Sequence, residues 1–430
     1  MKALLDLVAR HRSGEAIGIA SICSAHPVVL DAALIHARGN NRPVLIEATS
    51  NQVNQFGGYT GMRPADFHDF VMDKADRAGL AREQVLLGGD HLGPNAWQDE
   101  SAASAMAKSD VLIDEYVAAG FRKIHLDCSM SCADDPAVLT DAEVAARAAR
   151  LAAVAERTWQ RSGGEAPVYI VGTEVPVPGG AKEALDELQV TDPEAMAATV
   201  EAHRRAFAAH GLDEAWRRVI GLVVQPGVEF DHHDVVDFQP GKARALSAAI
   251  ERIPGLLYEA HSTDYQTPAA LAALVRGHFA ILKVGPGVTY ALRETLWALS
   301  FIEDEMLEAA KRSDLRRVVL DVMHAEPKYW NKYYTDAARL TLDLQYSLSD
   351  RMRYYWAHPR IRAACDTLLH NLDAASPGGA LPLALLSQYL PYQYDAVRAG
   401  RLANSATNLL RAGVTRVLEH YARACCPSLS

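Results

Sequence analysis

The stretch VLLGGDHLGPNAWQDESAASAMAKSDVLIDEYVAAGFRKIHLDC, residues 85–128, contains the pattern that decides the fold. Two apolar runs, at 85–90 and 123–128, are short and rich in residues that favour strands. Between them, residues 109–121 carry the i, i+3, i+4 apolar spacing of a helix. Two strands joined through a helix indicate a parallel crossover unit.

The same alternation of apolar run and helical segment recurs along the first 285 residues. The predicted strands are 17–23, 43–48, 85–90, 123–128, 168–174, 219–225, 256–261 and 280–285. Eight such units favour a closed (β/α)8 barrel over a doubly wound open sheet, which is the rival α/β fold. The strand signal fades after residue 300. We therefore expect a barrel over 1–300 that carries the site, and a helical extension over 301–430 packed on it.

Composition excludes several classes of function. The chain has 430 residues, 49% of them hydrophobic, and a formal net charge of −10, so we expect a soluble globular protein with no nucleic-acid surface. A run of about 18 apolar residues is missing, which argues against a membrane helix. The six cysteines are too scattered for a disulfide framework, and we expect reduced thiols and a cytoplasmic location.

Polar residues gather where the predicted strands end. In barrels of this kind, chemistry takes place at the carboxyl ends of the strands. The residues there are Glu47, Asp90, His91, Asp127, Glu174, Gln225, His261, Ser262 and Lys283, with Glu229, Asp231 and His232 close behind Gln225. A lone histidine at a strand end is more often structural than a ligand. A rim this dense in charge, however, is unfavourable unless a cation or a substrate compensates it.

Two further features have alternative interpretations. The glycines of GPG, residues 285–287, form either a tight turn or a phosphate seat made from backbone N–H groups. Arg351 and Arg353 in SDRMRYYW are candidates for a phosphate clamp, although structural or solvated arginines are the commoner interpretation.

Six stretches resemble the GatZ/KbaZ-type tagatose-bisphosphate aldolase subunits, and the resemblance covers nearly the whole chain. They are GGDHLGPNAW (88–97), HLDCSM (125–130), TEVPVPGG (173–180) with TDPEAM (191–196) downstream, VVQPGVEFDH (223–232), YEAHSTDYQTP (258–268) and LKVGPGVTYA (282–291). The barrel more distantly resembles the zinc-dependent class II ketose-bisphosphate aldolases. The family is sometimes labelled as tagatose 6-phosphate kinases, but the sequence contains no G-x-x-x-x-G-K-[ST] loop and no kinase signature.

This resemblance implies roles for individual residues. Asp90 would be the acid/base on the substrate hydroxyl, and Glu174 the carboxylate that handles a proton on the enediolate. His91 and His261 would bind a metal, and the third ligand would be Gln225, Glu229 or His232, of which position favours Glu229. Imidazole with carboxylate suits Zn²⁺, Mn²⁺ or Ni²⁺, and zinc is our first expectation. The remaining substrate-binding candidates are Glu47, Asp127, Ser262, Gly285 and Gly287.

Proteins that resemble this chain include non-catalytic aldolase partners and sugar 4-epimerases. Because the set of residues needed for chemistry is complete, we expect a metal-dependent epimerase that converts D-tagatose 6-phosphate into D-fructose 6-phosphate. The alternatives are a silent subunit of a class II tagatose-bisphosphate aldolase, or an active aldolase of that class. A free ketose or a uronate would also suit the site. The expected partners are a ketose phosphate, an aldolase catalytic subunit and further copies of this chain.

Overall fold

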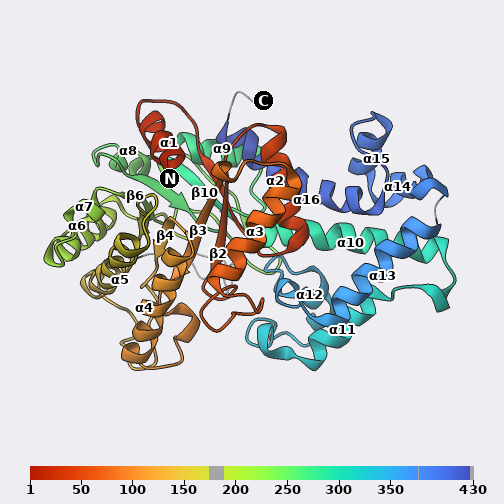
Figure 1. Cartoon of the computed structure of the whole chain (residues 1–430), viewed down its shortest axis with the longest axis horizontal. Coiled ribbons are helices and arrows are strands. Elements are labelled where there is room, and N and C mark those ends of the chain that lie inside the picture. The colour runs from red at the N-terminus through yellow and green to blue at the C-terminus, as the bar shows by residue number, and fades with distance from the viewer. Residues whose placement is uncertain (174–187, 376, 427–430) are drawn as a thin grey trace.

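Eight parallel strands close into a barrel in the computed structural model, which describes residues 1–173, 188–375 and 377–426 (Figure 1). Neighbouring strands follow the order β1-β10-β9-β6-β5-β4-β3-β2. The barrel strands are β1 (Ile19–Cys23), β2 (Val44–Thr49), β3 (Val85–Leu92), β4 (Lys123–Leu126), β5 (Val168–Val171), β6 (Val219–Val223), β9 (Leu257–Ala260) and β10 (Phe279–Val284). The prediction of a (β/α)8 barrel is confirmed. A small antiparallel pair, β7 (Glu229–Phe230) and β8 (Val235–Val236), lies in the chain after β6.

Helices alternate with the strands and then continue beyond the last of them. Over the barrel they are α1 (Lys2–Arg12), α2 (Pro27–Gly39), α3 (Pro64–Ala78), α4 (Ala102–Ala118), α5 (Asp141–Ser162), α6 (Pro193–Ala209), α7 (Asp213–Trp216), α8 (Arg244–Ile250) and α9 (Pro268–Arg276). Beyond β10 they are α10 (Pro286–Met306), α11 (Leu315–Ala325), α12 (Leu340–Tyr346), α13 (Pro359–Ala375), α14 (Leu383–Tyr389), α15 (Pro391–Arg398) and α16 (Ala406–Cys425). Local sequence fixes several starts: Thr140 and Glu143 form a capping box on α5, and Asp192 caps α6.

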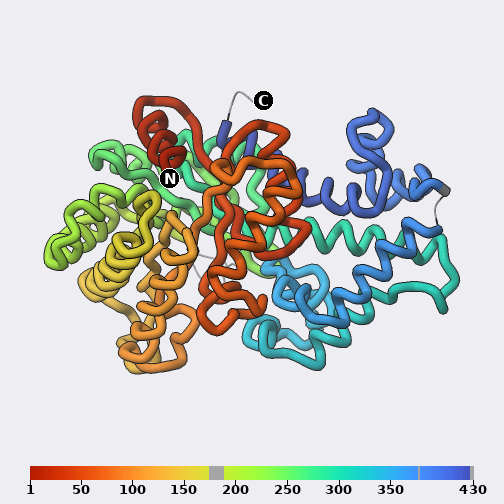
Figure 2. The backbone as a smooth tube through the Cα atoms, viewed as in Figure 1, coloured from red at the N-terminus to blue at the C-terminus, as the bar shows by residue number. Residues whose placement is uncertain are grey.

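The last helix returns to the barrel. From β10 the chain leaves along α10 into a group of helices on one side, and α16 then packs against α2, α9 and β1 (Figure 2). The Gly18 N–H, just before β1, donates to the Cys425 carbonyl at the end of α16, at 2.9 Å. The segment just before β1 and the end of α16 are therefore hydrogen-bonded to each other at the wall of the barrel. None of the described helices is long and apolar enough to cross a membrane.

The interior of the barrel contains a buried network of charges. The Lys123 ammonium on β4 lies 2.5 Å from Glu47 on β2 and 2.6 Å from Glu259 on β9. The Lys283 ammonium on β10 pairs with Glu47 and lies 2.8 Å from Asp90 on β3. Each of these residues is at most 5% exposed. Removing their charges from water costs free energy, which the ion pairs must offset. The network thus ties five strands of the barrel together.

We expect Lys123→Met to destabilise the fold strongly. The apolar side chain keeps most of the volume but leaves Glu47 and Glu259 facing each other without their shared cation. Removing one partner from a buried pair costs about 3–5 kcal/mol. Urea denaturation followed by tryptophan fluorescence should show a clearly lower midpoint for Lys123→Met, with a smaller loss in the double variant Lys123→Met with Glu259→Gln. An unchanged midpoint for the single variant would mean that the network does not support the fold.

Candidate active site

Backbone geometry at the ends of two strands turns consecutive side chains toward the barrel mouth. His91 and Ser262 have φ values of +48° and +52°, in the left-handed region that non-glycine residues seldom adopt. At the first of these positions, the pairing of β3 with β4 shifts between Gly89 and Leu92. Along a regular strand Asp90 and His91 would point to opposite faces. The irregularity instead lets both reach the same site, and backbone strain of this kind is concentrated at functional positions.

Two glycines of the GGDHLG stretch are required by close contacts. A Cβ on Gly88 would lie 2.8 Å from Glu47 Oε1, and a Cβ on Gly93 would lie 1.7 Å from the carbonyl oxygen of Asp127. Glycine at 88 therefore makes room for the buried carboxylate of β2, and glycine at 93 lets β3 end against the chain after β4.

Three imidazoles form a triangle in the barrel mouth. The ring centroids of His91, His125 and His261 lie 5.2 Å (91–125), 5.0 Å (91–261) and 5.2 Å (125–261) apart. All three side chains are buried. Burial lowers the pKa of His261 to about 4, so this ring is neutral at pH 7 and able to act as a ligand.

Carboxylates orient the rings in this triangle. Asp127 Oδ2 lies 2.7 Å from His91 Nδ1, and Glu259 Oε1 lies 2.9 Å from His261 Nε2. These contacts leave His261 Nδ1 for another partner, whereas His91 Nε2 faces Asp90 Oδ2 at 3.7 Å. In the described part of the chain, Nε2 of His125 is buried and has no hydrogen-bond partner. A ring held by a carboxylate on one nitrogen, with the other nitrogen available, is the usual arrangement of metal-binding histidines.

Asp90 is the carboxylate at the centre of the group. Its Oδ1 lies 2.8 Å from the Lys283 ammonium and 2.9 Å from His125 Nδ1, whereas its Oδ2 lies 3.6 Å from Cys23 Sγ. Burial alone would raise the pKa of Asp90, but the charges of His91 and Lys283 hold it well below its usual range. Asp90 is therefore ionised, as a proton acceptor must be.

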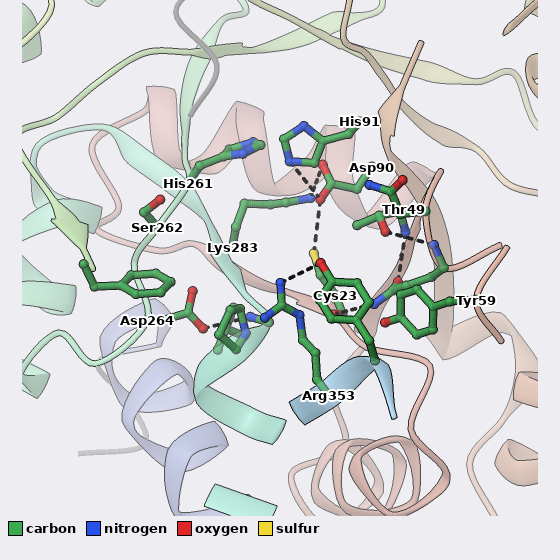
Figure 3. Close-up of a pocket in the computed structure, with 17 residues that line it drawn as sticks. Cys23, Thr49, Tyr59, Asp90, His91, His261, Ser262, Asp264, Lys283 and Arg353 are labelled. Carbon is green, nitrogen blue, oxygen red and sulfur yellow. Dashed lines mark hydrogen bonds and ion pairs between the residues drawn. The ribbon is translucent and has the colours of Figure 1, made fainter. Parts of the chain in front are cut away.

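A pocket of about 630 Å³, including its mouth, opens onto these residues (Figure 3). This volume is within the usual range for small-molecule sites. Asp90, His91 and His261 line one side of the pocket, and Arg353 enters from the opposite side. The complete lining is Cys23, Thr49, Asn51, Gln52, Tyr59, Asp90, His91, Phe230, His261, Ser262, Asp264, Lys283, Val284, Gly285, Pro286, Arg353 and Tyr354.

The structure brings together most, but not all, of the side chains that the sequence singled out. Asp127 lies behind His91, and Glu47 lies below the pocket in the charge network. Glu229 is buried beside Ser262, where burial raises its pKa to about 7, and its carboxylate is not part of the group around the imidazoles. Glu174 lies outside the described residues, so its assigned role stays a prediction.

The other two candidates for a third ligand have structural partners. Gln225 Oε1 accepts the N–H groups of Gly227 and Val228, at 2.8 and 3.0 Å. His232 lies against the helical extension, with Nε2 3.1 Å from the Tyr333 carbonyl oxygen and Nδ1 3.2 Å from Ser349 Oγ. Both side chains therefore stabilise the loop that follows β6.

The backbone donors of the GPG turn are occupied by a side chain. The N–H groups of Gly285 and Gly287 both donate to Asp264 Oδ1, at 2.9 and 2.7 Å. Of the two interpretations of these glycines, a tight turn or a phosphate seat, the structure shows the backbone donors holding a carboxylate of the chain itself. Burial raises the pKa of Asp264 to about 6, although both amides lower it.

Sequence reasoning missed His125 and Glu259 because it considered only the last residue of each strand. His125 precedes Asp127 by two positions, and Glu259 precedes His261 by two. Residues two apart on a strand face the same side. The polar side chains at every second position of KIHLD, residues 123–127, were the signal available in the sequence.

Four side chains are placed to hold a metal ion. Asp90, His125, Glu259 and His261 each offer a ligand atom, and these atoms all lie within 4.8 Å of one another. The donor set of imidazole nitrogens and carboxylate oxygens fits a divalent transition metal. Charge also favours a cation, because four buried carboxylates, Glu47, Asp90, Asp127 and Glu259, outnumber the two ammonium groups even when His91 is protonated.

Fold and site together define a class: a (β/α)8 barrel with clustered imidazoles and carboxylates in its mouth and a large helical extension. The chain belongs to the D-tagatose-1,6-bisphosphate aldolase subunit GatZ/KbaZ-like family, whose model matches residues 4–426. The family resemblance predicted from the sequence is thereby confirmed.

Solved structures provide a second comparison. A probable tagatose 6 phosphate kinase from Sinorhizobium meliloti 1021 is 50% identical, with a TM-score of 0.87, and the match covers 95% of this chain and 100% of that one. The YdjI aldolase from Escherichia coli K12 is 12% identical, with a TM-score of 0.42 and coverage of 82% of this chain and 95% of that one. A putative fructose-1,6-bisphosphate aldolase from Coccidioides immitis is 14% identical, with a TM-score of 0.43 and coverage of 85% and 98%.

The carboxylate in the GPG turn should make stability depend on pH. The pKa of Asp264 is about 6 in the folded chain, against 3.8 for an ordinary aspartate. Its contribution to stability is therefore fully present below pH 4 and is lost as the pH rises through 6. Asp264→Asn keeps an oxygen acceptor and cannot titrate. Between pH 4 and 7, its free energy of unfolding should therefore rise relative to that of the wild type, by at most about 3 kcal/mol. Parallel pH profiles of the wild type and the variant in urea denaturation would contradict this.

Proposed function

We propose that this protein is a metal-dependent epimerase that inverts C4 of a ketohexose phosphate, converting D-tagatose 6-phosphate into D-fructose 6-phosphate by retro-aldol and aldol steps. The observation that carries the proposal is that His91, His261 and the ionised Asp90 line one pocket, with the buried His125 ring packed against both histidines. The family supports the sugar class, because its description names a D-tagatose-1,6-bisphosphate aldolase subunit.

Of the four clustered side chains, His125 and His261 would hold the ion. His91, whose ring centroid lies 5.2 and 5.0 Å from theirs, would be the third ligand. Asp90 and Glu259 would stay beside the ion, paired with Lys283 and Lys123, and we favour Zn²⁺ for this imidazole-rich set. Glu229 stays the alternative third ligand proposed from the sequence. When bound, a divalent cation supplies Lewis acidity to the ketose carbonyl. Mn²⁺ and Ni²⁺ suit similar donors.

Asp90 is the group that would move the proton. Its carboxylate takes the proton of the C4 hydroxyl, the C3–C4 bond breaks, and the bonding electrons pass to the ketone-bearing fragment as the C4 carbon becomes an aldehyde. If the aldehyde fragment then rotates so that its other face meets C3, C3 attacks that face and Asp90 returns the proton to the C4 oxygen. The Lys283 ammonium keeps Asp90 ionised at the start of this cycle.

The pocket has features that suit an epimerase, which must keep the aldehyde fragment from leaving. Tyr59 from the chain after β2, and Arg353 and Tyr354 from the helical extension, also line the pocket. In Figure 3, Tyr59 and Arg353 lie across the pocket from His91 and His261. The Tyr59 and Tyr354 rings are in edge contact, with centroids 4.8 Å apart. Walls that enclose a reactive fragment allow rebonding before release.

The alternative function is that named by the family description, a subunit of a tagatose-bisphosphate aldolase. In one version the chain is an active class II aldolase, which releases triose phosphate from a ketose bisphosphate. In the other it is silent and stabilises a separate catalytic subunit. The kinase name of the Sinorhizobium meliloti relative stays with that protein, since this sequence contains no phosphate-binding lysine loop.

A single assay separates these functions. Purified protein loaded with zinc is incubated with D-tagatose 6-phosphate, and fructose 6-phosphate and triose phosphate are followed by NMR. We expect fructose 6-phosphate to form, chelator to abolish its formation, and zinc to restore it. Asp90→Asn should lower turnover by about 10²–10⁴-fold, the usual contribution of a positioned acid/base.

The control for Asp90→Asn is Asp69→Asn, at an exposed aspartate of α3, which should leave turnover unchanged. Triose phosphate accumulating without the epimer would favour the aldolase. Neither product in the presence of zinc would reject the enzyme and favour the silent subunit. Full activity of Asp90→Asn would remove this residue from the mechanism.

A further inference from the structure

We propose that Arg353, supplied by the helical extension, binds the phosphate of the substrate, and that the GPG turn does not. The inference rests on the proposed function for the identity of the sugar, but its argument comes from the charges around the pocket. It assigns the extension a role in selecting phosphorylated over free ketoses.

The backbone donors at the GPG turn are already occupied. The N–H groups of Gly285 and Gly287, at the start of α10, already donate to Asp264 Oδ1. Asp264 itself is 3% exposed, and a Cβ added to Gly287 would lie 3.1 Å from its Oδ1, so the carboxylate fills the space in front of the turn. A phosphate approaching these amides would meet a negative charge of the chain, which costs free energy.

Lys283 and Arg353, which both line the pocket, differ in their partners. Lys283 is neutralised by Glu47 and Asp90. Arg353 instead donates to neutral acceptors: the carbonyls of Ser349 and Asp350, the latter at 3.0 Å, and the Tyr354 hydroxyl at 2.9 Å. Over the described residues, no carboxylate oxygen forms an ion pair with Arg353 within 4.0 Å, although the charges of Asp350 and Asp264 act on it from farther away. Without a direct carboxylate partner, the Arg353 guanidinium can still pair with an anion in the pocket.

Aromatic contacts orient the Arg353 guanidinium. Its central carbon lies 4.5 Å from the centroid of the Tyr354 ring, and Tyr354 in turn contacts Tyr59. In Figure 3 the side chain rises between Asp264 and Tyr59 toward Cys23. A guanidinium fixed in this way is suited to bind phosphate oxygens through two N–H groups.

The neighbouring Arg351 does not share this role. Its guanidinium carbon lies 3.5 Å from the centroid of Tyr333, and its Nε donates to the Tyr329 carbonyl at 2.8 Å. Arg351 does not line the pocket. Of the two arginines in the motif, the geometry thus selects Arg353 as the one that faces the ligand, at the end of the pocket remote from the imidazoles.

The test measures binding and turnover separately. Affinities of wild type, Arg353→Met and Arg353→Lys for fructose 6-phosphate and for fructose are measured by calorimetry on zinc-loaded protein. Charge-assisted contacts of this kind correspond to about a 10- to 100-fold change in affinity. We expect Arg353→Met to weaken fructose 6-phosphate binding by that factor and to leave fructose binding unchanged, with Arg353→Lys in between. Inorganic phosphate should compete with fructose 6-phosphate on the wild type and not on Arg353→Met.

The matched control is Arg362→Met, at an exposed arginine of α13 that lines the adjacent cavity and not this pocket. It should bind both sugars like the wild type, and thermal melting confirms that each variant is folded. If Arg353→Met does not fold, the affinities of Arg353→Lys and the competition by inorganic phosphate on the wild type decide the question. The proposal would be overturned if Arg353→Met lost affinity for fructose and for fructose 6-phosphate equally. It would also be overturned if Asp264→Asn bound fructose 6-phosphate more tightly while Arg353→Met kept the wild-type affinity.

Failure of the proposed function would look different. Wild-type protein that binds fructose 6-phosphate through Arg353 but does not interconvert it with tagatose 6-phosphate would reject the epimerase and keep the phosphate site. If the protein interconverts the two sugar phosphates but its preference for phosphorylated over free sugar is unchanged in the Arg353 variants, the epimerase function stands and the phosphate site is rejected.

Discussion

The rest of the structure depends on the ion-pair network inside the barrel. Lys123 and Lys283 lie among Glu47, Asp90 and Glu259, and together these residues join strands that are distant in the sequence. Buried charges are tolerated only when each has close partners. The same pairs that stabilise the interior also leave a negative charge in excess. This excess favours the binding of a cation in the mouth of the barrel.

The network also explains how the histidines are presented. Glu259 is shared, since one oxygen contacts Lys123 and the other lies 2.9 Å from His261. Asp127 holds His91 in the same manner. Each ring is therefore fixed by a group that is itself fixed by the barrel, which is the condition for a precise ligand set. The pocket above it is completed by the helical extension, which returns through α16 to the barrel wall.

The sequence predicted the barrel because each strand is a short apolar run bounded by polar or glycine residues. It also predicted that Asp90, His91 and His261 lie close together, because they are at or next to the carboxyl ends of their strands. It did not single out His125, which lies inside a strand. The occupation of the GPG amides by Asp264 was not predictable either. It depends on how the loop after β9, in which Ser262 and Tyr265 have left-handed φ values, lies against the start of α10, and residue type alone does not specify that contact.

The central claim is that the triangle of His91, His125 and His261 is a metal site. Anomalous diffraction at the zinc edge, from crystals of zinc-loaded protein, tests it most directly. The account predicts one peak within bonding distance of all three imidazoles, at about 2.0–2.1 Å from each ligating nitrogen. A peak beside Glu229 that excludes His125, or no peak in the barrel mouth, would contradict it.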